Sequence, residues 1–359
     1  MPTRRIRIAV VYGGRSSEHS ISVLSAGSVL AALDPAKYEV VPVGIAPNGQ
    51  WLLTGATPAT MQLEGRTLPS VTGGTSVVLE TTGAGLVPVT AGEVAGALHE
   101  VDVVFPVLHG RWGEDGTIQG MLELSGVPYV GPGVFASAAG MDKEFSKILL
   151  AGAGLDVGSY VVARRGRPFS AVDAQALGLP VFVKPARAGS SVGITRVTDW
   201  ADLDAALQEA FRHDDKALIE AAVAGREVEC GVLENAAGEP EASLPAEIRL
   251  RPDSGHDWYD FEAKYLEDAY DLDLPAKLDD EVTARVREAA CRAFEAVDCA
   301  GLARVDFFVV GDRVIVNEIN TMPGFTSTSM YPKMWAATGV EYPELVDRLV
   351  AAALRRAGR

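Results

Sequence analysis

A carboxylate and an amide stand two residues apart in the stretch "VIVNEINTMPG". Glu318 and Asn320 would project from the same face of a strand, because successive side chains of a strand alternate between its two faces. A carboxylate in an apolar setting is costly unless a partner neutralises it. The pattern therefore predicts that a cation, either a metal ion or a basic side chain, faces Glu318.

A second acidic residue lies on the preceding segment "LARVDFFVVGDRV", and a glycine-aspartate turn joins the two segments into a hairpin. A three-residue loop at 311–313 would place Asp306 opposite Glu318. In the same register Arg304 would lie opposite Asn320, whereas a two-residue loop would put the two carboxylates on opposite faces. The apolar remainder of the shared face would be Phe308, Val310, Val314 and Val316.

Two carboxylates and an amide oxygen suit Mg²⁺, which takes one or two protein carboxylates and completes its coordination with water and phosphate oxygens. An ion-pair cluster of Arg304 with the two carboxylates, without a metal, accounts for the same residues equally well. The hairpin alone leaves both interpretations open.

A lysine and a glycine-serine loop follow an apolar run in "LPVFVKPARAGSSVGITRV". Small residues such as Gly189, Ser190 and Ser191 let backbone N–H groups approach phosphate oxygens, and Lys184 adds a positive charge. The order of a Walker A loop is absent, and an ordinary connection between strands would explain this loop if it stood alone. A second lysine, Lys143 in "GMDKEFSK", is by itself typical of a solvated helix face.

Glutamates flank a short segment in "ALIEAAVAGREVE". The backbone after Glu220 could hydrogen-bond to a purine edge while Glu227 reaches ribose hydroxyls, although a hinge with surface glutamates is the plainer explanation. Near the N-terminus, Glu18 lies at a strand-to-helix turn, where a parallel sheet forms its ligand crevice. Its negative charge could equally stabilise the N-terminus of the following helix by interacting with the helix dipole.

Two further segments could face a substrate. His109 ends the apolar run "VDVVFPVLHG", but a lone histidine is usually structural. Lys264 and Tyr265 in "DWYDFEAKYLEDA" are potential donors on a loop that could close over a site. An exposed surface loop is the alternative for that segment.

Strand-like and helix-like patterns alternate over about the first 130 residues, beginning with a strand at 5–12, which predicts a doubly wound parallel sheet. Residues 55–95 have no clear period and are interpreted as an insertion or a weak hairpin. The stretch "SAAGMDKEFSKILLAGAG" predicts one helix, and the pattern becomes hairpin-rich after about residue 220. "DDEVTARVREAACRAFEAVD" carries an apolar stripe that predicts a helix packed on a core.

The composition is that of a soluble globular protein, with 48% apolar and 22% charged residues among 359. A formal net charge of −16 disfavours general binding of nucleic acid or anionic membranes, since both need a basic surface. The apolar run in the N-terminal "MPTRRIRIAVVYGG" is too short, and too soon broken by glycine, for a signal sequence or a membrane span. The three cysteines lack metal-ligand spacing, and we expect a cytoplasmic protein.

The motifs are individually weak, but their order and spacing are specific. "GGRSSEHSIS", "HGRWGEDGTIQG", "GMDKEFSK", "VFVKPARAGSSVG", "EAKY", "RVDFFV" and "NEINTMPGFTSTSMYP" together resemble the D-alanine–D-alanine ligases, enzymes of the ATP-grasp superfamily. The resemblance extends from residue 5 to about 335. It implies an α/β ATP-grasp fold with a Rossmann-like substrate domain at 1–131, a central subdomain at 132–219 and a metal-binding C-terminal domain at 220–359.

The resemblance also implies the reaction and the site. ATP would phosphorylate the carboxylate of one D-alanine, and the amine of a second would attack the acyl phosphate, for peptidoglycan precursor synthesis. The implied catalytic residues are Glu18, Ser190, Tyr265, Arg304 and Gly324. Substrate would contact His109, Lys264, Ser329 and Met330. The nucleotide would contact Lys143, Lys184, Ser191, Glu220, Val223 and Glu227. The implied metal ligands are Asp306, Glu318 and Asn320.

The implied cofactors are ATP and two Mg²⁺ ions, for which Mn²⁺ could substitute; activation by a monovalent cation is left open. A homodimer is the implied assembly. Two features depart from the family pattern: Ala188 stands where members often carry glutamate, and the 55–95 segment is longer than in compact members.

Competing interpretations are another ATP-grasp carboxylate–amine or depsipeptide ligase, and a nucleotide-binding module without catalysis. The interpretation as a dehydrogenase rests only on the stretch "GPGVFA" and is the least supported of the alternatives. The tyrosine of "EAKY" resembles the type that forms dipeptide rather than D-alanyl-D-lactate.

Overall fold

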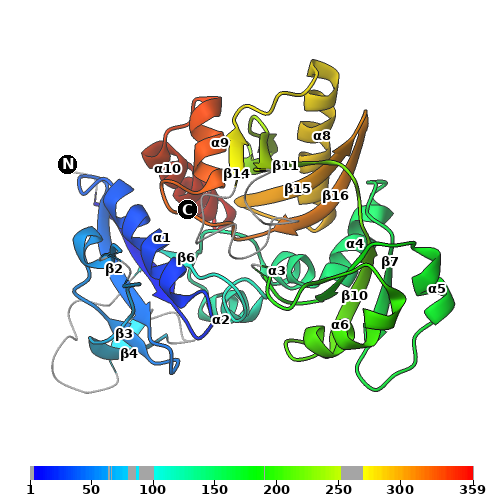
Figure 1. Cartoon of the computed structure of the whole chain (residues 1–359). Helices are drawn as coiled ribbons and strands as arrows, with labels where there is room; N and C mark the ends of the chain where they lie inside the picture. Colours follow the sequence, from blue (N-terminus) through cyan, green and yellow to red (C-terminus); the bar gives the residue numbers. More distant parts are fainter. Residues whose placement is uncertain are drawn as a thin grey trace.

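The computed structural model describes residues 4–63, 65, 67–79, 86–88, 101–189, 191–251 and 270–358. Three sheets organise these residues, and helices cover them (Figure 1). Lys264 and Tyr265, which are predicted to close over the site, lie outside the described residues. So does Ser190 of the glycine-serine loop at 189–193, which is called the phosphate loop below because it is predicted to cover phosphates.

The N-terminal sheet has the strand order β5-β4-β3-β2-β1-β6. Its parallel part, as predicted, consists of β1 (Ile6–Gly13), β2 (Tyr38–Ile45) and β6 (Val103–Val107). The remaining strands pair antiparallel and extend the sheet at the β2 edge: β3 (Trp51–Leu53), β4 (Thr75–Leu79) and β5 (Leu86–Pro88). The described part of the 55–95 segment therefore contributes a hairpin to this sheet. Its helices are α1 (His19–Ala32), η1 (Pro58–Met61) and α2 (Thr117–Ser125).

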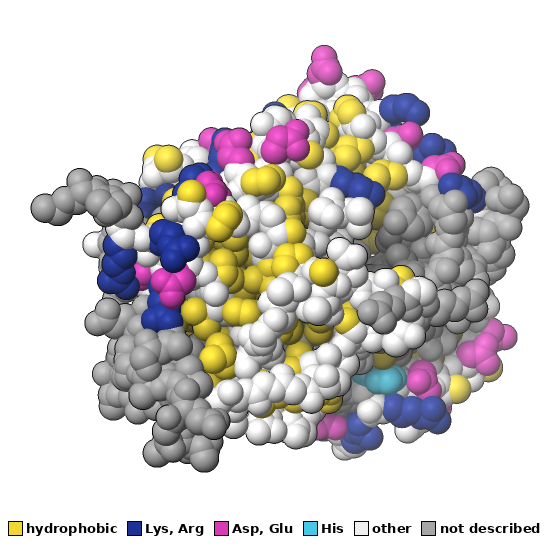
Figure 2. Space-filling view, turned by 90° about the vertical axis from the view of Figure 1, so that its left-hand side faces the viewer, with side chains coloured by type: hydrophobic (Ala, Val, Ile, Leu, Met, Phe, Trp, Pro, Cys, Tyr) yellow, Lys and Arg dark blue, Asp and Glu magenta, His cyan; other side chains and the backbone are white. Residues whose placement is uncertain are grey.

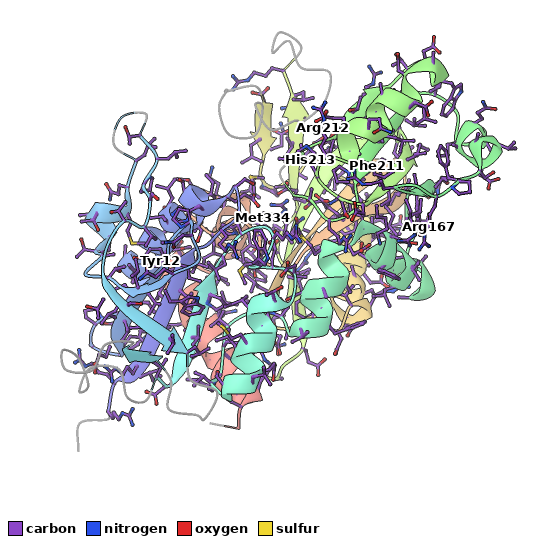
Figure 3. The ribbon with its side chains drawn as sticks, turned by 90° about the horizontal axis from the view of Figure 1, so that it is seen from below. Tyr12, Arg167, Phe211, Arg212, His213 and Met334 are labelled. Atoms are coloured by element: carbon purple, nitrogen blue, oxygen red, sulfur yellow. The ribbon has the colours of Figure 1, made fainter. Side chains whose placement is uncertain are left out.

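The middle sheet has four antiparallel strands in the order β7-β10-β8-β9. The strands are β7 (Tyr160–Arg164), β8 (Val181–Pro185), β9 (Thr195–Val197) and β10 (Lys216–Ala221). The helices of this part are α5 (Ala171–Ala176), η2 (Trp200–Asp202) and α6 (Leu203–Ala210). The predicted domain boundary at 219/220 would divide β10, so we place the end of this unit after Ala221. Figure 3 shows Phe211, which follows α6, on the opposite side of the molecule from Tyr12 of β1.

The C-terminal sheet has the order β14-β13-β11-β15-β16, with β12 paired to β11. Its strands are β11 (Arg226–Glu234), β12 (Pro240–Ala242), β13 (Ala246–Leu250), β14 (Tyr270–Asp273), β15 (Leu302–Val310) and β16 (Arg313–Asn320). Helices α3 (Val134–Met141) and α4 (Lys143–Gly152) contact β16, although they precede the middle sheet in sequence. Helix α8 (Asp280–Ala296) buries its predicted stripe of Val282, Val286, Ala289, Ala290, Ala293 and Phe294.

A hairpin formed by β15 and β16 carries the predicted metal ligands, and its geometry differs from the expectation in one respect. The loop has two residues, since Val310 pairs with Arg313, and the three-residue loop was wrong. Asp306 nevertheless lies opposite Glu318, because a β-bulge after Asp306 adds one residue, Asn317, to β16. The extra residue restores the register that the shorter loop alone would have lost.

The same bulge corrects the predicted apolar face. Val316 pairs with Phe307, and both are buried in the core cluster on the side away from the carboxylates. Val314 packs against the same cluster. Val314 and Val316 therefore do not share a face with Asp306, because one extra residue reverses the alternation along β16.

The single helix predicted over "SAAGMDKEFSKILLAGAG" is two helices, α3 and α4, which meet at Asp142. Asp142 has an extended backbone and its side chain accepts hydrogen bonds from the N–H groups of Glu144 and Phe145. This arrangement is an N-terminal helix cap. The cap places Lys143 in the first turn of a new helix rather than in the middle of a continuous one.

The first and last parts of the chain share one hydrophobic core. Helices α9 (Met330–Thr338) and α10 (Tyr342–Arg356) contribute Trp335 and Leu349 to the cluster that contains Val10 of β1 and Phe105 of β6. Figure 1 shows α10 on the side of α1 and β6. The N-terminal sheet is thus completed by segments more than 200 residues away in sequence.

The surface seen from the side of the N-terminal sheet carries apolar side chains across its middle and charged side chains mainly toward its edges (Figure 2). No helix among the described residues has the length and apolar character needed to cross a membrane.

Candidate active site

One cavity of about 710 Å³ is lined by residues of the middle and C-terminal sheets, by α1 and by the connections between the sheets. Every predicted site residue that the structure describes contributes to its wall. These are Glu18, His109, Lys143, Lys184, Ser191, Glu220, Val223, Glu227, Arg304, Asp306, Glu318, Asn320, Gly324, Ser329 and Met330. The structure therefore brings together residues that are separated by as many as 312 positions, from Glu18 to Met330.

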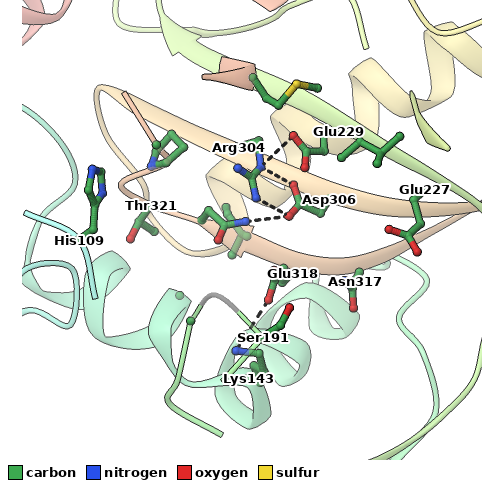
Figure 4. A pocket seen from close by; sticks show the side chains of 18 of the residues that line it. His109, Lys143, Ser191, Glu227, Glu229, Arg304, Asp306, Asn317, Glu318 and Thr321 are labelled. Atoms are coloured by element: carbon green, nitrogen blue, oxygen red, sulfur yellow. Dashed lines mark hydrogen bonds and ion pairs between the residues drawn. The ribbon is translucent and has the colours of Figure 1, made fainter. Parts of the chain in front are cut away.

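The hairpin carboxylate Asp306 is held by a guanidinium and an amide (Figure 4). Arg304 Nε donates to Asp306 Oδ1 at 2.7 Å, and Arg304 Nη2 donates to Oδ2 at 2.8 Å. Asn320 Nδ2 donates to Asp306 Oδ2 at 3.0 Å. A second carboxylate, Glu229 of β11, lies 3.3 Å from Arg304 Nε. Burial opposes the charge of Arg304, but Asp306 and Glu229 outweigh it and hold the guanidinium pKa well above its usual value.

The other hairpin carboxylate, Glu318, faces Lys143. The Lys143 Nζ lies 3.7 Å from Glu318 Oε2 and donates to the carbonyl oxygen of Ala188 at 2.8 Å. Burial lowers the pKa of Lys143, and the charge of Glu318 opposes that shift. Lys143 therefore joins α4, the phosphate loop and the hairpin, and it does not lie on a solvated helix face.

A third buried carboxylate, Glu220 of β10, lies between two lysines. Lys184 Nζ is 2.6 Å from Glu220 Oε2, and Lys147 Nζ is 3.4 Å from Oε1. Burial raises the pKa of Glu220, but the charges of Lys184 and Lys147 lower it more, so the net shift is downward. Glu220 is thus an ionised carboxylate at the wall of the cavity.

Glu18 reaches the cavity from the turn that precedes α1. A Cβ added at Gly110 would lie 2.6 Å from Glu18 Oε2, so the carboxylate closely approaches the backbone there, and the left-handed conformation of Gly110 (φ +76°) favours glycine. A Cβ at Gly189 would lie 3.7 Å from the same oxygen. The Glu18 carboxylate is therefore next to both the segment after His109 and the phosphate loop.

His109 lines the cavity with both ring nitrogens engaged by the protein. Nδ1 lies 3.2 Å from the carbonyl oxygen of Met322, and Nε2 lies 3.1 Å from Ser25 Oγ. Burial lowers the pKa of the imidazole. In the neutral ring Nδ1–H donates to Met322 and Nε2 accepts from Ser25, so His109 fixes the loop that carries Gly324 relative to α1.

Residues of the 324–330 segment also line the cavity. Ser329 is the residue before the first turn of α9, and its Oγ accepts from Thr326 N at 3.1 Å. A Cβ at Gly324 would lie 3.3 Å from Ser329 Oγ. The start of α9 and Gly324 are therefore adjacent, and a helix N-terminus favours an anionic group.

Sequence reasoning missed several charged residues of this region. Lys147 stands four residues after Lys143, a helical spacing that could have placed both on one face of α4. Glu114 follows His109 within the quoted glycine-rich stretch and accepts from Gly110 N at 3.0 Å. Burial, together with the charge of Glu18, raises the Glu114 pKa to about 8. Glu229 carries no motif, and only the pairing of β11 with β15 places it opposite Asp306.

The described residues contain no cluster of three or more His, Cys, Asp or Glu side chains arranged to hold a metal ion. Asp306, Glu318 and Asn320 do offer hard oxygen ligands to the cavity: Asp306 and Glu318 lie opposite one another across the hairpin, and Asn320 follows Glu318 by two residues on β16. This set fits Mg²⁺ that receives its remaining ligands from water and from phosphate oxygens.

Comparisons with known proteins agree on one family. Family models described as D-ala D-ala ligase N-terminus and C-terminus match residues 7–132 and 149–351. A curated D-alanine–D-alanine ligase of Nocardia farcinica is 59% identical over 99% of this chain and 98% of its own length. One of Rhodococcus erythropolis is 58% identical over 99% of each chain.

Solved structures give the same result. The D-alanine–D-alanine ligase of Coxiella burnetii superimposes with a TM-score of 0.83 at 34% identity, covering 99% of this chain and 96% of that one. A D-Ala:D-Ser ligase of Enterococcus faecalis also has a TM-score of 0.83, at 33% identity, with 98% and 100% covered. The Bacillus anthracis D-alanine–D-alanine ligase complexed with ATP has a TM-score of 0.74 at 27% identity, with 98% and 99% covered.

Proposed function

The chain belongs to the D-alanine–D-alanine ligase family, and on this premise we propose how its cavity divides the work of the reaction. The enzyme is an ATP-dependent ligase that joins two D-alanines into D-alanyl-D-alanine for peptidoglycan precursor synthesis. The observation that carries the division of roles is the single cavity in which Glu18, the lysines of the phosphate side and the carboxylate hairpin meet.

Lys143 and Lys184 bind phosphate oxygens of ATP in this proposal. Phosphoryl transfer to a carboxylate brings two anions together, so positive charge must neutralise the transferring group. Both lysines line the cavity, and the small residues of the loop at 189–193 allow its backbone to cover the phosphates. Ser190 and Ser191 belong to that loop.

The nucleoside end of ATP occupies the wall formed by β10 and β11. Glu220 and Val223 border the adenine, and Glu227 accepts from ribose hydroxyls. Their position in the same cavity as the two lysines supports this assignment.

Asp306, Glu318 and Asn320 would hold two Mg²⁺ ions, for which Mn²⁺ could substitute. The ions would neutralise phosphate charge during transfer. Arg304 and Lys143 lie 2.7 Å and 3.7 Å from oxygens of Asp306 and Glu318, so basic side chains accompany the carboxylates that would bind the metal ions.

The first D-alanine binds with its ammonium group at Glu18, near His109. The second places its carboxylate at Ser329 and Met330, where the N-terminus of α9 favours an anion. Arg304 and the N–H of Gly324 donate to the oxyanion that forms when the second amine attacks the acyl phosphate. Lys264 and Tyr265 close the site through a link of Tyr265 with Ser190 and Glu18.

A homodimer in the cytoplasm completes the proposal. The homodimer rests on the family resemblance. Sedimentation velocity of the purified protein tests it by giving the mass of the species in solution.

Phosphate release with ATP, Mg²⁺ and D-alanine, compared with L-alanine, D-lactate and D-serine, tests the substrate assignment. D-serine belongs in the comparison because a structural relative is a D-Ala:D-Ser ligase. We expect release with D-alanine and D-alanyl-D-alanine as the product, identified by mass. Release that is independent of D-alanine, or faster with D-lactate or D-serine, would contradict the assignment.

A further inference from the structure

Lys147 is a buried lysine beside the cavity to which the proposed function gives no role. It lies one turn after Lys143 on α4 and is only 2% exposed. Its Nζ is 3.4 Å from Glu220 Oε1 and donates to the carbonyl oxygen of Asn317 at 3.4 Å. Lys147 does not line the cavity, whereas Glu220 and Lys184 both do.

Glu220 has two cationic partners, Lys184 and Lys147, and a bound nucleotide could contact only one of them. Lys184 is the closer partner and is exposed to the cavity, so phosphate oxygens compete with Glu220 for its ammonium group. Lys147 approaches the other carboxylate oxygen from the protein side. A phosphate in the cavity has no access to Lys147, because its side chain is enclosed by protein.

A buried carboxylate that loses its partner is strongly unfavourable. Glu220 is only 8% exposed, so the departure of Lys184 would strand its charge if no second cation remained. The extra residue of the hairpin bulge, Asn317, gives Lys147 a carbonyl acceptor that holds its ammonium group in place.

We propose that Lys147 is a positioning residue that keeps Glu220 paired and fixed in place while Lys184 turns from Glu220 to the phosphates of ATP. The inference rests on the proposed nucleotide site and extends it to a residue behind the cavity wall. Lys147 thereby lowers the free-energy cost of separating Lys184 from Glu220. It also keeps Glu220 at the wall where the nucleoside end of ATP is proposed to bind.

The test is the binding of ATP and of adenosine, measured by titration calorimetry, directly for ATP and by competition for adenosine. In Lys147→Met, releasing Lys184 would strand Glu220, so we expect ATP affinity to fall roughly tenfold or more. Adenosine, which has no phosphate to attract Lys184, should bind with little change. An equal loss for both ligands, or no loss for ATP, would overturn the proposal.

A double-variant cycle separates this role from a general structural one. In Glu220→Gln no carboxylate remains to be stranded, so adding Lys147→Met to that variant should cause no further loss of ATP affinity. This double variant contains no buried carboxylate that could be stranded at this position, and it keeps the proposal testable if Lys147→Met alone fails to fold. A further large loss in the double variant would contradict the proposal.

Arg226→Met is the matched control. It removes the cationic partner of another buried carboxylate, Glu247, outside the cavity, and should lower the melting temperature without changing the ratio of ATP to adenosine affinity. If the unmodified protein does not bind ATP, the proposed nucleotide site fails. If it binds ATP and the cycle shows no coupling, only the role of Lys147 fails.

Discussion

At the scale of single residues, three carboxylates of the cavity are each paired with a basic side chain. Arg304 holds Asp306, Lys143 faces Glu318, and Lys184 holds Glu220. In the proposed function, the nucleotide and its metal ions carry both signs of charge and would compete for the partners in these pairs. A substitution in one of the pairs should therefore change activity and stability by different amounts.

Glu318→Gln should reduce phosphate release by about 10²–10³-fold, a loss of the size seen when one group that stabilises transition-state charge is removed. The amide keeps the shape but not the charge that metal ions need. Melting followed by circular dichroism should change little, because Glu318 is partly exposed and its lysine partner is 3.7 Å away. Glu247→Gln, on β13 outside the cavity, is the control that should retain activity. Retained turnover in Glu318→Gln would remove this residue from the metal site.

Glu114 should make stability depend on pH. Burial raises its pKa to about 8, from an ordinary value of 4.5. Between these values the folded chain holds a proton that the unfolded chain has lost, so this contribution to stability declines as pH rises from about 4.5 to about 8. Glu114→Gln, which cannot ionise, should therefore gain in melting temperature over the natural protein as pH increases across this window.

The reference for that experiment is Glu288→Gln, on the exposed side of α8, which should change the melting temperature little throughout. A difference between Glu114→Gln and the natural protein that stays constant from pH 5 to pH 8.5 would show that Glu114 is ionised in the folded chain.

At the scale of elements, the hairpin shows what sequence could and could not predict. The spacing of Glu318 and Asn320, and the pairing of Asp306 with Glu318, were correct, yet the loop is one residue shorter than expected and Asn317 forms a bulge. The alternation of side chains along a strand identifies which residues could share a face. It cannot reveal that a shorter loop and a bulge compensate each other, as they do here. For the same reason Val314 and Val316 were assigned to the wrong face.

The break between α3 and α4 was also beyond periodicity, because apolar spacing continues across Asp142. The aspartate that ends one helix and caps the next is paired with a buried lysine of the middle sheet, Lys216, at 2.5 Å.

Lys147 and Glu229 were missed because each is a single charged residue within a regular element. Only the packing of α4, β10, β11 and β15 gives them partners.

Asp142→Ala should lower the free energy of unfolding by at least the ~1 kcal/mol of a helix cap, since Lys216 also loses one of its carboxylates. Lys143 is the next residue, so we expect the KM for ATP to rise severalfold as the first turn of α4 loosens. Ser170→Ala is the matched control, because Ser170 caps α5 through Asp173 N, remote from the cavity. It should cost similar stability with no change in KM. An unchanged KM in Asp142→Ala would mean that the cap does not position Lys143.

At the scale of the whole molecule, three sheets surround one cavity, and the N-terminal sheet depends on the end of the chain. Leu345, Val346, Leu349 and Val350 of α10 belong to the core cluster of β1 and β6. Arg356 donates to the carbonyl oxygens of Tyr129 and Gly131 and pairs with Glu234 at 2.9 Å. Parallel strands were predictable from sequence, but this closure by a distant helix was not, since no local pattern indicates which sheet an amphipathic helix covers.

A chain that ends at residue 340 should fail to form the N-terminal sheet. It would expose the apolar side chains that α10 covers, so we expect aggregation or the loss of cooperative melting, measured by calorimetry. Removal of residues 358–359 alone, beyond the helix, should leave the transition unchanged. Cooperative melting of the shorter chain at the normal temperature would show that α10 is dispensable for the core.

This shared core has a consequence for protein synthesis. The strands of the N-terminal sheet leave the ribosome some 200 residues before α10 is made, which at about 5–20 residues per second corresponds to roughly 10–40 s. During each round of translation the sheet waits with part of its apolar surface uncovered. Nascent chains of this enzyme should therefore engage chaperones at the first sheet, and should release them only when the last helix has emerged.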